Sequence, residues 1–491
     1  MARLDLAALD RLLPGVARPA YDPRAVAVGI LHLGLGAFHR AHQAVYTDDV
    51  LAGDPRWGIA GVSLKTPRAI EPLAAQEGLY TLLTRTSDGV TARVIGSVRE
   101  TIFAGHARPA LVARFADPRI TIVSSTVTEK GYCHDPASGA LDFAHPDIVH
   151  DLAHPDVPIS AVGIVVAGLR ARCAAGAGPV TFVCCDNLPH NGATVRGLVA
   201  ALAQRRDLAL AQWIEDNVSF PSTMVDRIVP ATTDADVAEA ARQLGYEDAA
   251  PVTAEPFGQW VIEDDFRAAR PAWERAGAQF VSDVAPFELM KLRLLNGSHS
   301  TLAYLGFMLG HDYVWQASGD PLLAPFVERQ MREEIVPTLA RPAGTDLLAY
   351  CQALMQRFRN AALPHRTRQI AMDGSQKLPQ RLLGTVRDRL AAGAPLVHLP
   401  LAVAAWIRYA SGTDERGRAI EVQDPLAATF RAVVDRAGGD PAAVADGFLD
   451  LASVFGDLTG HGAFRDAVRA HTMALFRDGA AKTLSSHLAR S

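Results

Sequence analysis

Short apolar runs alternate with helical patterns through the first part of the chain. The runs are "AVAVGILHLGLG" (25–36), "WGIAGVSL" (57–64), "RITIVSSTVTE" (119–129) and "PVTFVCCDN" (179–187), and helical spacing recurs between them, as at 107–116 and 192–206. Strands that are apolar on both faces are typical of a parallel sheet covered by helices. The alternation predicts an α/β fold, a doubly wound domain of the Rossmann type.

Two further patterns complete the expected organisation. "YTLLTRTSDGVTARVIGSV" (80–98) predicts a β-hairpin with Asp88-Gly89 at its turn. Past about residue 285, apolar residues recur with the 3.6-residue helical period, interrupted by Pro and Gly. We therefore expect a dinucleotide-binding domain over 1–284 and a mostly α-helical domain over 285–491.

Composition narrows the class of protein. The 491 residues are 49% hydrophobic and 21% charged, with a net charge of −5, and the basic residues are spread along the chain. This balance gives no reason to expect nucleic acid as a partner. The N-terminus shows no signal-peptide pattern, and the chain contains no apolar run of ~18 residues. We expect a cytoplasmic protein without a membrane span, whose adjacent Cys184 and Cys185 are small buried hydrophobes.

A glycine-rich turn follows the first predicted strand. In "LHLGLGAFHRAHQA", Gly34 and Gly36 occupy the first two places of GxGxxG, and His39 stands at the third. The first two glycines make the tight turn and admit a pyrophosphate, whereas the third serves helix–strand packing. The pattern predicts a dinucleotide cradle that includes Ala37 and Phe38, with a wider helix–strand crossing at His39. A plain strand–helix turn is the alternative.

The end of the second predicted strand bears on the choice of cofactor. An NAD-binding domain of this type carries an acid there for the ribose hydroxyls, but this chain reads "GVSLKTPRAIEPL". Lys65, Thr66 and Arg68 stand where an Asp is expected. The two basic side chains either accommodate the 2′-phosphate of NADP or are solvated surface cations. We expect NAD, with NADP as an open alternative.

The stretch "ELMKLRLLNGSHSTLAYLGF" (288–307) combines an apolar helical pattern with polar residues. On an ideal α-helix turning ~100° per residue, Lys291, Asn296, His299 and Glu288 share one broad face, and Arg293 lies nearly opposite. A desolvated lysine can exchange a proton with an alcohol, an asparagine amide can polarise a carbonyl, and a histidine can orient either group. A polar strip exposed to solvent would explain the same spacing.

Other polar positions are open to both structural and functional interpretations. Asn187 follows a predicted parallel strand, where sites of α/β proteins gather. Asp226 and Arg227 lie within an apolar run and form either a structural pair or a support for the site. No Cys/His/Glu spacing typical of zinc is present, which disfavours a zinc alcohol dehydrogenase and predicts no metal site. The remaining histidine group is interpreted as loop residues: His134, His145, His150 and His154.

Taken together, several motifs resemble the polyol-specific long-chain dehydrogenase family, the mannitol dehydrogenases and their relatives. The motifs are "GLGAFHRAHQA", "TVTEKGY", "CDNLPHNG", "FPSTMVDRIVP", "EPFGQWVIED" and "MKLRLLNGSHS", and the resemblance runs from about residue 25 to beyond 460. It implies a zinc-independent, NAD(P)-dependent oxidoreductase of keto and hydroxy sugars. It also implies a Rossmann-type domain, a helical domain and an active site in the cleft between them.

The resemblance implies a role for each matching residue. Lys291 corresponds to the catalytic lysine, Asn187 and Asn296 to the carbonyl-binding asparagines, His299 to the site histidine, and Glu288 to an acid that gates proton exchange. Asp226 and Lys377 correspond to substrate-side residues. The cofactor-binding residues that we expect are Gly34, Gly36, Ala37, Phe38, Lys65, Arg68, Thr128 and Asn187.

Within the family, "HRTRQIAMDGSQKLPQR" (365–381) resembles the fructuronate reductases, and Gln369 replaces an arginine of the mannitol dehydrogenases. A sugar acid needs a cation for its carboxylate, which Arg366, Arg368, Lys377 or Arg381 can supply, although each is equally interpretable as a surface charge. We expect reversible reduction of D-fructuronate to D-mannonate by a monomer or small homo-oligomer. The alternatives are mannitol or arabinitol oxidation, tagaturonate reduction and a non-catalytic NAD-binding sensor.

Overall fold

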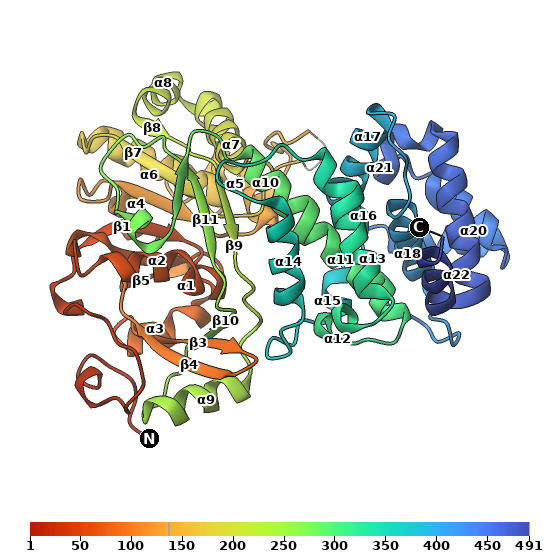
Figure 1. The fold of residues 1–491 in the computed structure, drawn as a ribbon. Helices are drawn as coiled ribbons and strands as arrows, with labels where there is room; N and C mark the ends of the chain where they lie inside the picture. Colours follow the sequence, from red (N-terminus) through yellow and green to blue (C-terminus); the bar gives the residue numbers. More distant parts are fainter. Residues whose placement is uncertain (136–137, 491) are drawn as a thin grey trace. The chain divides into compact units, whose positions relative to one another are not determined.

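The computed structural model describes residues 1–135 and 138–490, and the chain divides into two compact units, Met1–Ala285 and Pro286–Ser491 (Figure 1). The first unit is built on a six-stranded parallel sheet in the order β5-β2-β1-β6-β7-β8. The chain order reverses between β1 and β6, as in dinucleotide-binding folds. The strands are β1 (Val28–Leu33), β2 (Gly58–Ser63), β5 (Val98–Phe103), β6 (Ile122–Ser125), β7 (Val180–Cys184) and β8 (Val218–Ser219).

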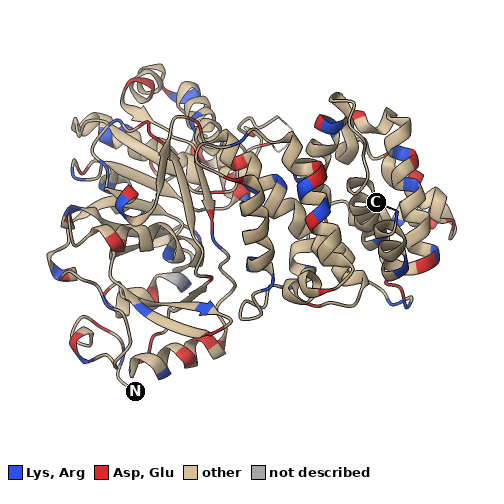
Figure 2. Ribbon diagram, viewed as in Figure 1, with Lys and Arg blue, Asp and Glu red and all other residues tan. Residues whose placement is uncertain are grey.

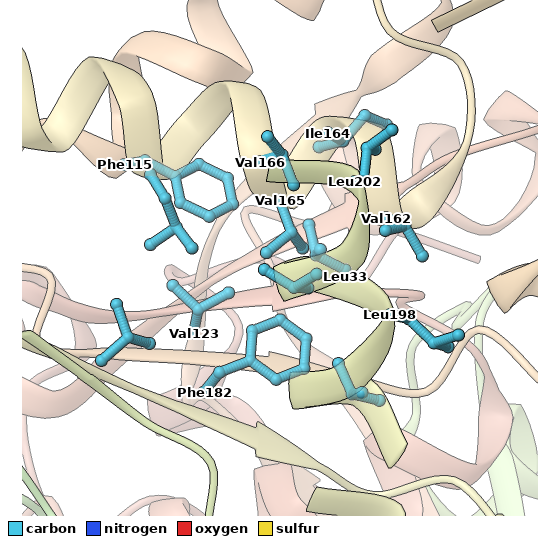
Figure 3. Close-up of a cluster of buried hydrophobic side chains, with 14 of the residues drawn as sticks. Leu33, Phe115, Val123, Val162, Ile164, Val165, Val166, Phe182, Leu198 and Leu202 are labelled. Carbon is cyan, nitrogen blue, oxygen red and sulfur yellow. The ribbon is translucent and has the colours of Figure 1, made fainter. Parts of the chain in front are cut away.

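Both faces of this sheet are covered, because alternate side chains of a strand point to opposite sides. Leu31 and Leu33 of β1 enter one apolar cluster, shown in part in Figure 3, and Ile30 enters the cluster on the other face. A β-carbon on Gly168 would lie 2.3 Å from the ring of Phe115, so this glycine lets two helices pack closely. The helices that contribute to the first cluster include α4 (Ala104–Phe115), α6 (Ala161–Ala175), α7 (Asn191–Arg206) and α8 (Leu208–Asn217).

Two three-stranded sheets complete the first unit, in the orders β10-β3-β4 and β12-β11-β9. The predicted hairpin is β3 with β4, but its loop is Ser87 and Asp88, because Thr86 already pairs with Gly89. The turn therefore lies one residue earlier than expected. The remaining elements are α1 (Ala37–Ala41), α2 (Gln43–Val50), α3 (Glu71–Ala75), β3 (Tyr80–Thr86), β4 (Gly89–Ile95), α5 (Pro146–Ala153), β9 (Thr223–Asp226), α9 (Asp234–Leu244), β10 (Val252–Ala254), β11 (Gln259–Glu263) and β12 (Gln279–Val281).

The second unit is helical, which confirms the predicted fold class. Its central helix, α11 (Gly297–Met308), is buried along nearly its whole length and packs against α12, α13, α15 and α18. This part of the stretch 288–307 is thus a helix enclosed on all sides. The other helices are α10 (Ala285–Met290), α12 (Val314–Gly319), α13 (Leu323–Arg329), α14 (Leu347–Phe358), α15 (Thr367–Ala371), α16 (Gly374–Leu378), α17 (Gly384–Ala391), α18 (Leu399–Ala410), α19 (Ala427–Ala437), α20 (Pro441–Leu449), α21 (Ala452–Phe455) and α22 (Gly462–Leu488).

Three segments of this unit are π-helical, with one more residue per hydrogen-bonded turn than an α-helix. They are η7 (Lys291–Asn296), η8 (Gln330–Ile335) and η10 (Pro379–Leu383), and η7 packs against both of the others. The expectation of an ideal α-helix through 288–307 is therefore wrong over six residues. Such wide turns often mark functional sites.

Charged residues of both signs are interspersed along both units (Figure 2). Across the described residues, every helix is too short or too polar to cross a bilayer.

Candidate active site

The glycine turn after β1 has the conformation that the sequence predicts. Gly34 has a φ of +99°, and a β-carbon there would lie 2.2 Å from the carbonyl oxygen of Thr126. A side chain at this position is excluded by both the backbone conformation and the space. At Gly36 the nearest atom to such a carbon is the Gly34 carbonyl oxygen at 3.8 Å. Gly34 is thus required by the fold, whereas Gly36 leaves the turn open to a ligand.

The third place of the glycine motif holds a buried imidazole. The ring of His39 is fully buried and stacks on the ring of His32 with 3.4 Å between centroids. His32 in turn hydrogen-bonds the hydroxyls of Ser124 at 2.8 Å and Thr126 at 2.9 Å, and burial lowers the pKa of His32 to about 3. The two stacked rings therefore lie between helix and strand at the place where a third glycine would let them pack closely.

The helix that follows the turn is shorter than the pattern indicates. α1 ends at Ala41, and His42 has a φ of −125° and a ψ of −96°, outside the helical region, before α2 begins. Phe38 stacks on the His42 ring at 5.1 Å. The interruption limits the expected helix to five residues behind the glycine turn.

A pocket of about 290 Å³ opens beside this turn, at the carboxyl ends of β1, β2 and β6. Gly34, Gly36, Lys65 and Lys130 line it, together with Ser160 at the start of α6. This is the place where doubly wound sheets bind nucleotides, outside the reversal of strand order. The predicted Gly34, Gly36 and Lys65 therefore share one pocket. Of the other cofactor candidates, Arg68 is exposed in the short 3-10 helix η4 (Pro67–Ala69) after β2, Ala37 opens α1, and Thr128 follows β6.

Asp186 organises the loops at the edge of this pocket, a role that sequence reasoning missed. Its carboxylate accepts hydrogen bonds from the backbone N–H groups of Val127 (3.0 Å) and Thr128 (2.8 Å) and from the Tyr132 hydroxyl (2.7 Å). Burial raises the pKa of Asp186, although these hydrogen bonds act to lower it. Thr128 has a φ of +69°, so the carboxylate holds a strained backbone in place. The exposed Asn187 follows directly, and the acid before it in "CDN" was the available signal.

The Asp226–Arg227 motif ends strand β9. Asp226 is buried and faces Gln259 across the antiparallel pair β9–β11. Arg227 donates to the carbonyl oxygens of Ala41 at 2.6 Å and Glu255 at 2.9 Å. The guanidinium thus ties the end of α1 to the segment after β10, which supports the structural interpretation for Arg227.

In the second unit, the π turn η7 begins at Lys291 and ends at Asn296. Both side chains are half-buried, as is that of Glu288 in α10 one turn before. Arg293 is buried and pairs with Asp388 of α17 at 2.6 Å and with the Thr338 hydroxyl at 3.0 Å. The wide turn thus directs Arg293 toward α17. The angular positions that an ideal α-helix predicts for the other residues do not apply across this turn.

Arg381 lies beside the end of the π turn. Its guanidinium donates to the Ser300 hydroxyl at 3.2 Å and to the Asn296 carbonyl oxygen at 3.4 Å. A β-carbon on Gly297 would lie 2.8 Å from the Arg381 carbonyl oxygen. The glycine therefore allows the backbone of η10 to approach the start of α11, which brings Arg381 next to Asn296.

His299 is the centre of a cluster of cationic and imidazole side chains. Burial lowers the pKa of His299 well below its ordinary value, and the next largest effects come from His365, Arg381, Arg357 and Lys291. Its ring contacts Phe358 at 4.5 Å and His365 at 5.5 Å. These five residues are called the His299 cluster below: Lys291, His299, Arg357, His365 and Arg381.

The other predicted substrate-side residues fall into two groups. Lys377 donates from Nζ to the carbonyl oxygen of Met372 at 2.6 Å and lies close enough to His365 to lower its pKa. Arg366 and Arg368 are exposed, and their guanidinium groups lie over the rings of Tyr313 and Phe307, each 5.1 Å from the centroid. Arg381 thus belongs to the His299 cluster and Lys377 is adjacent to it, whereas the described contacts of Arg366 and Arg368 are with aromatic rings.

Cys133, His145 and Asp147 bring three potential metal-ligand atoms within 4.8 Å of one another, which their spacing did not indicate. The Nδ1 atom of His145 accepts a hydrogen bond from the Asp147 N–H, and burial raises the pKa of Cys133 to about 11. Zinc prefers a thiolate and an imidazole with a lone pair to share. In the described geometry the Nδ1 lone pair of His145 is already shared with the Asp147 N–H. His150 lies in α5 rather than in the expected loop.

Comparison with known proteins covers both units. Residues 28–275 match the model of the mannitol dehydrogenase Rossmann domain, and residues 283–475 match that of the mannitol dehydrogenase C-terminal domain. The chain is 46% identical to D-mannonate oxidoreductase of Escherichia coli, over 97% of this chain and 99% of that protein. It is 42% identical to mannitol 2-dehydrogenase of Cereibacter sphaeroides, over 96% and 99%.

A solved structure agrees with these sequences. The ternary complex of Pseudomonas fluorescens mannitol 2-dehydrogenase with NAD and D-mannitol superposes with a TM-score of 0.89, at 39% identity and with 100% of both chains covered.

Proposed function

The chain belongs to the mannitol dehydrogenase family, and from that premise we propose that it catalyses the reversible NAD(H)-dependent reduction of D-fructuronate to D-mannonate. It is an oxidoreductase that acts on CH–OH groups, and its first unit is the family's Rossmann domain. The reaction class follows from the family. The substrate is the part that rests on the described residues.

The residues of the first pocket fit a dinucleotide. Gly34 makes the turn, the open space at Gly36 admits a pyrophosphate, and the pocket lies at the reversal of strand order. When bound, NADH supplies the hydride. Lys65 lines the same pocket and is available to a 2′-phosphate, which is why NADP is included in the test below.

We assign the proton chemistry to the second unit, with Asn187 and Asp226 of the first unit as further site residues. Lys291 donates the proton that converts the substrate's alkoxide to an alcohol, and it takes that proton back in the oxidation direction. Asn296 and Asn187 donate amide hydrogen bonds to the same oxygen as its negative charge develops. His299 orients the substrate, Glu288 exchanges the lysine's proton with water, and Asp226 contacts the sugar.

The observation that carries the choice of a sugar acid is the positive surroundings of His299. Lys291, Arg357 and Arg381 all act on this buried imidazole, and Lys377 acts on the neighbouring His365. Cations gathered around buried neutral rings lower the cost of burying a carboxylate, and an arginine fork matches its geometry. A neutral polyol offers no negative charge for these groups.

Oxidation of mannitol or arabinitol to the ketose is the second candidate function. It is supported by the match to the mannitol 2-dehydrogenase complex and by the 42% identity to the Cereibacter sphaeroides enzyme. In that reaction, the same lysine and asparagines act on a neutral substrate. The two substrates differ at the end remote from the ketone, which is a carboxylate in the sugar acid and a neutral group in the polyol.

The test is a substrate panel with both cofactors. NADH or NADPH consumption is followed with fructuronate, tagaturonate and fructose, and NAD or NADP reduction with mannonate, mannitol and arabinitol. We expect the highest kcat/KM with fructuronate and mannonate. Activity on fructose and mannitol with none on the acids would contradict the proposal, and a maximum with tagaturonate would change the substrate. Inactivity throughout, with tight NADH binding, would indicate a sensor.

A further inference from the structure

Two adjacent imidazoles in the second unit have buried nitrogen atoms without partners. The rings of His299 and His365 meet nearly at right angles, with 82° between their planes and 5.5 Å between centroids. The Nε2 atom of His299 and the Nδ1 atom of His365 are buried and have no hydrogen-bond partner in the described structure. Buried polar atoms are normally satisfied, so these two are expected to gain partners from a ligand or its water.

The backbone holds His365 firmly in this position. Its N–H donates to the Leu363 carbonyl oxygen at 2.7 Å, and its own carbonyl oxygen accepts from Val314 at 3.0 Å. Two residues on, the N–H of Thr367 donates to the Asp312 carbonyl oxygen at 2.9 Å. The ring is therefore presented by an anchored segment just before α15, which is the preorganisation that a binding residue needs.

The groups that face the two rings are cationic. Burial lowers the pKa of His365 to about 4, and the nearby charge of Lys377 adds to this effect. His299 is affected by His365 itself and by Arg381, Arg357 and Lys291. Both rings are consequently neutral at pH 7 and lie among ammonium and guanidinium groups. An anion bound here would meet several cations and an imidazole that can accept a proton.

We propose that His365 is a specificity-determining residue that, together with Lys377, receives the carboxylate of the sugar acid while Lys291 serves its ketone. The inference rests on the proposed function and deepens it. In fructuronate the ketone and carboxylate carbons are four carbon–carbon bonds apart, roughly 5 Å in an extended chain. The His299 and His365 rings are 5.5 Å apart, so a sugar acid whose carboxylate meets His365 also reaches His299. His299, next to Lys291, would then contact the middle of the sugar.

Binding of the carboxylate at His365 and Lys377 is coupled to the uptake of a proton. A bound carboxylate favours the charged imidazolium, so it raises the pKa of His365 from its value of about 4 in the free protein. Between the two pKa values, binding takes up a proton and the affinity for the acid rises as the pH falls. A neutral polyol brings no charge and has no such effect. This pH dependence is not expected of a purely structural histidine.

The experiment compares His365→Gln and His365→Phe with the wild-type enzyme and with His471→Gln as a matched control. His471 is another partly buried histidine of the second unit, in α22. KM and kcat are measured with fructuronate and fructose, and dissociation constants of mannonate and mannitol are measured from pH 5 to 8 by NADH fluorescence. Melting temperatures identify any variant that is simply unfolded.

We expect both His365 variants to raise KM for fructuronate about 10- to 100-fold and to leave the fructose value within about twofold. The pH dependence of mannonate binding should disappear in the same variants, and His471→Gln should match the wild type. Equal losses on both substrates, or no change on either, would overturn the inference. A wild-type enzyme without activity on uronates would refute the proposed function, and this is recognised before any variant is made.

Discussion

The carbonyl oxygen of Arg381 lies 2.8 Å from the point where a β-carbon on Gly297 would stand. Contacts this short force a backbone to move, so Gly297→Ala is expected to separate η10 from the start of α11. We expect a loss of about 1–3 kcal/mol in the free energy of unfolding. A lower turnover should accompany it, because Asn296 and Arg381 lose their shared position. Urea denaturation and steady-state kinetics measure the two effects.

Gly319→Ala is the matched control for this substitution. Gly319 ends α12 and has open space around its β-carbon position. The control should leave both stability and turnover nearly unchanged. If the two alanine variants behave alike, the close approach at Gly297 does not constrain the site.

Replacement of Lys291 by alanine tests the proton donor. General acid–base catalysis by a positioned side chain typically contributes 10²- to 10⁴-fold, and we expect Lys291→Ala to lower kcat by about that factor. The dissociation constant of NADH should stay the same, because the dinucleotide pocket belongs to the other unit. Lys482→Ala, at an exposed lysine paired with Asp478, is the control. A turnover near the wild-type value would remove Lys291 from the mechanism.

Alanine substitutions at the two glycines of the turn are expected to have different effects. Gly34→Ala places a β-carbon 2.2 Å from a carbonyl oxygen at a φ of +99°, so it should lower the melting temperature and abolish NADH binding together. Gly36→Ala has room in the protein itself and should fold normally while binding NADH at least tenfold more weakly. Calorimetry and fluorescence titration separate the two. Unaltered NADH affinity in Gly36→Ala would argue against a pyrophosphate at this turn.

Acid is expected to destabilise the first unit through His32. Burial lowers the pKa of His32 to about 3, whereas the unfolded chain has the ordinary value near 6.5. The stability linked to this neutral ring is complete above about pH 6.5 and is lost as the pH falls toward 3, since the unfolded state binds the proton first. By pH 5 the loss should be about 2 kcal/mol.

Urea denaturation at pH 7.5, 6.5, 5.5 and 5 measures this loss. His32→Gln should make the dependence shallower by about this amount, with the remainder due to other buried histidines such as His39, and His106→Gln, at an exposed histidine, should leave it intact. An unfolding free energy that rises as the pH falls through this range would contradict the assignment.

The sheet and the glycine turn could be predicted because their causes are local. β1 is buried at every residue, so its apolar run identifies it, and Gly34 is required by its own backbone conformation. The hairpin was predicted but its turn was placed one residue late, since Gly89 is also the first residue of β4. In these cases the sequence pattern predicts that an element exists but places its boundary less accurately.

The features that the sequence did not reveal depend on distant neighbours. A π turn takes up about one residue more than an α-helical turn. The spacing of apolar residues around Lys291 is therefore compatible with both. The link between His299 and His365 joins α11 to a segment some 66 residues on. Asp186 could have been suspected from its place before Asn187, but its bonds to Val127 and Thr128 depend on how two loops meet.

The wide turn at 291–296 also bears on how this enzyme could be redesigned. Its hydrogen-bond ladder includes one residue more than an α-helix needs, so a single deletion there can be absorbed by conversion to regular helix. Such a deletion would rotate Lys291 relative to His299 and would remove one side chain of the turn. Chain length at this turn is therefore a design variable for the position of Lys291, in addition to amino-acid identity.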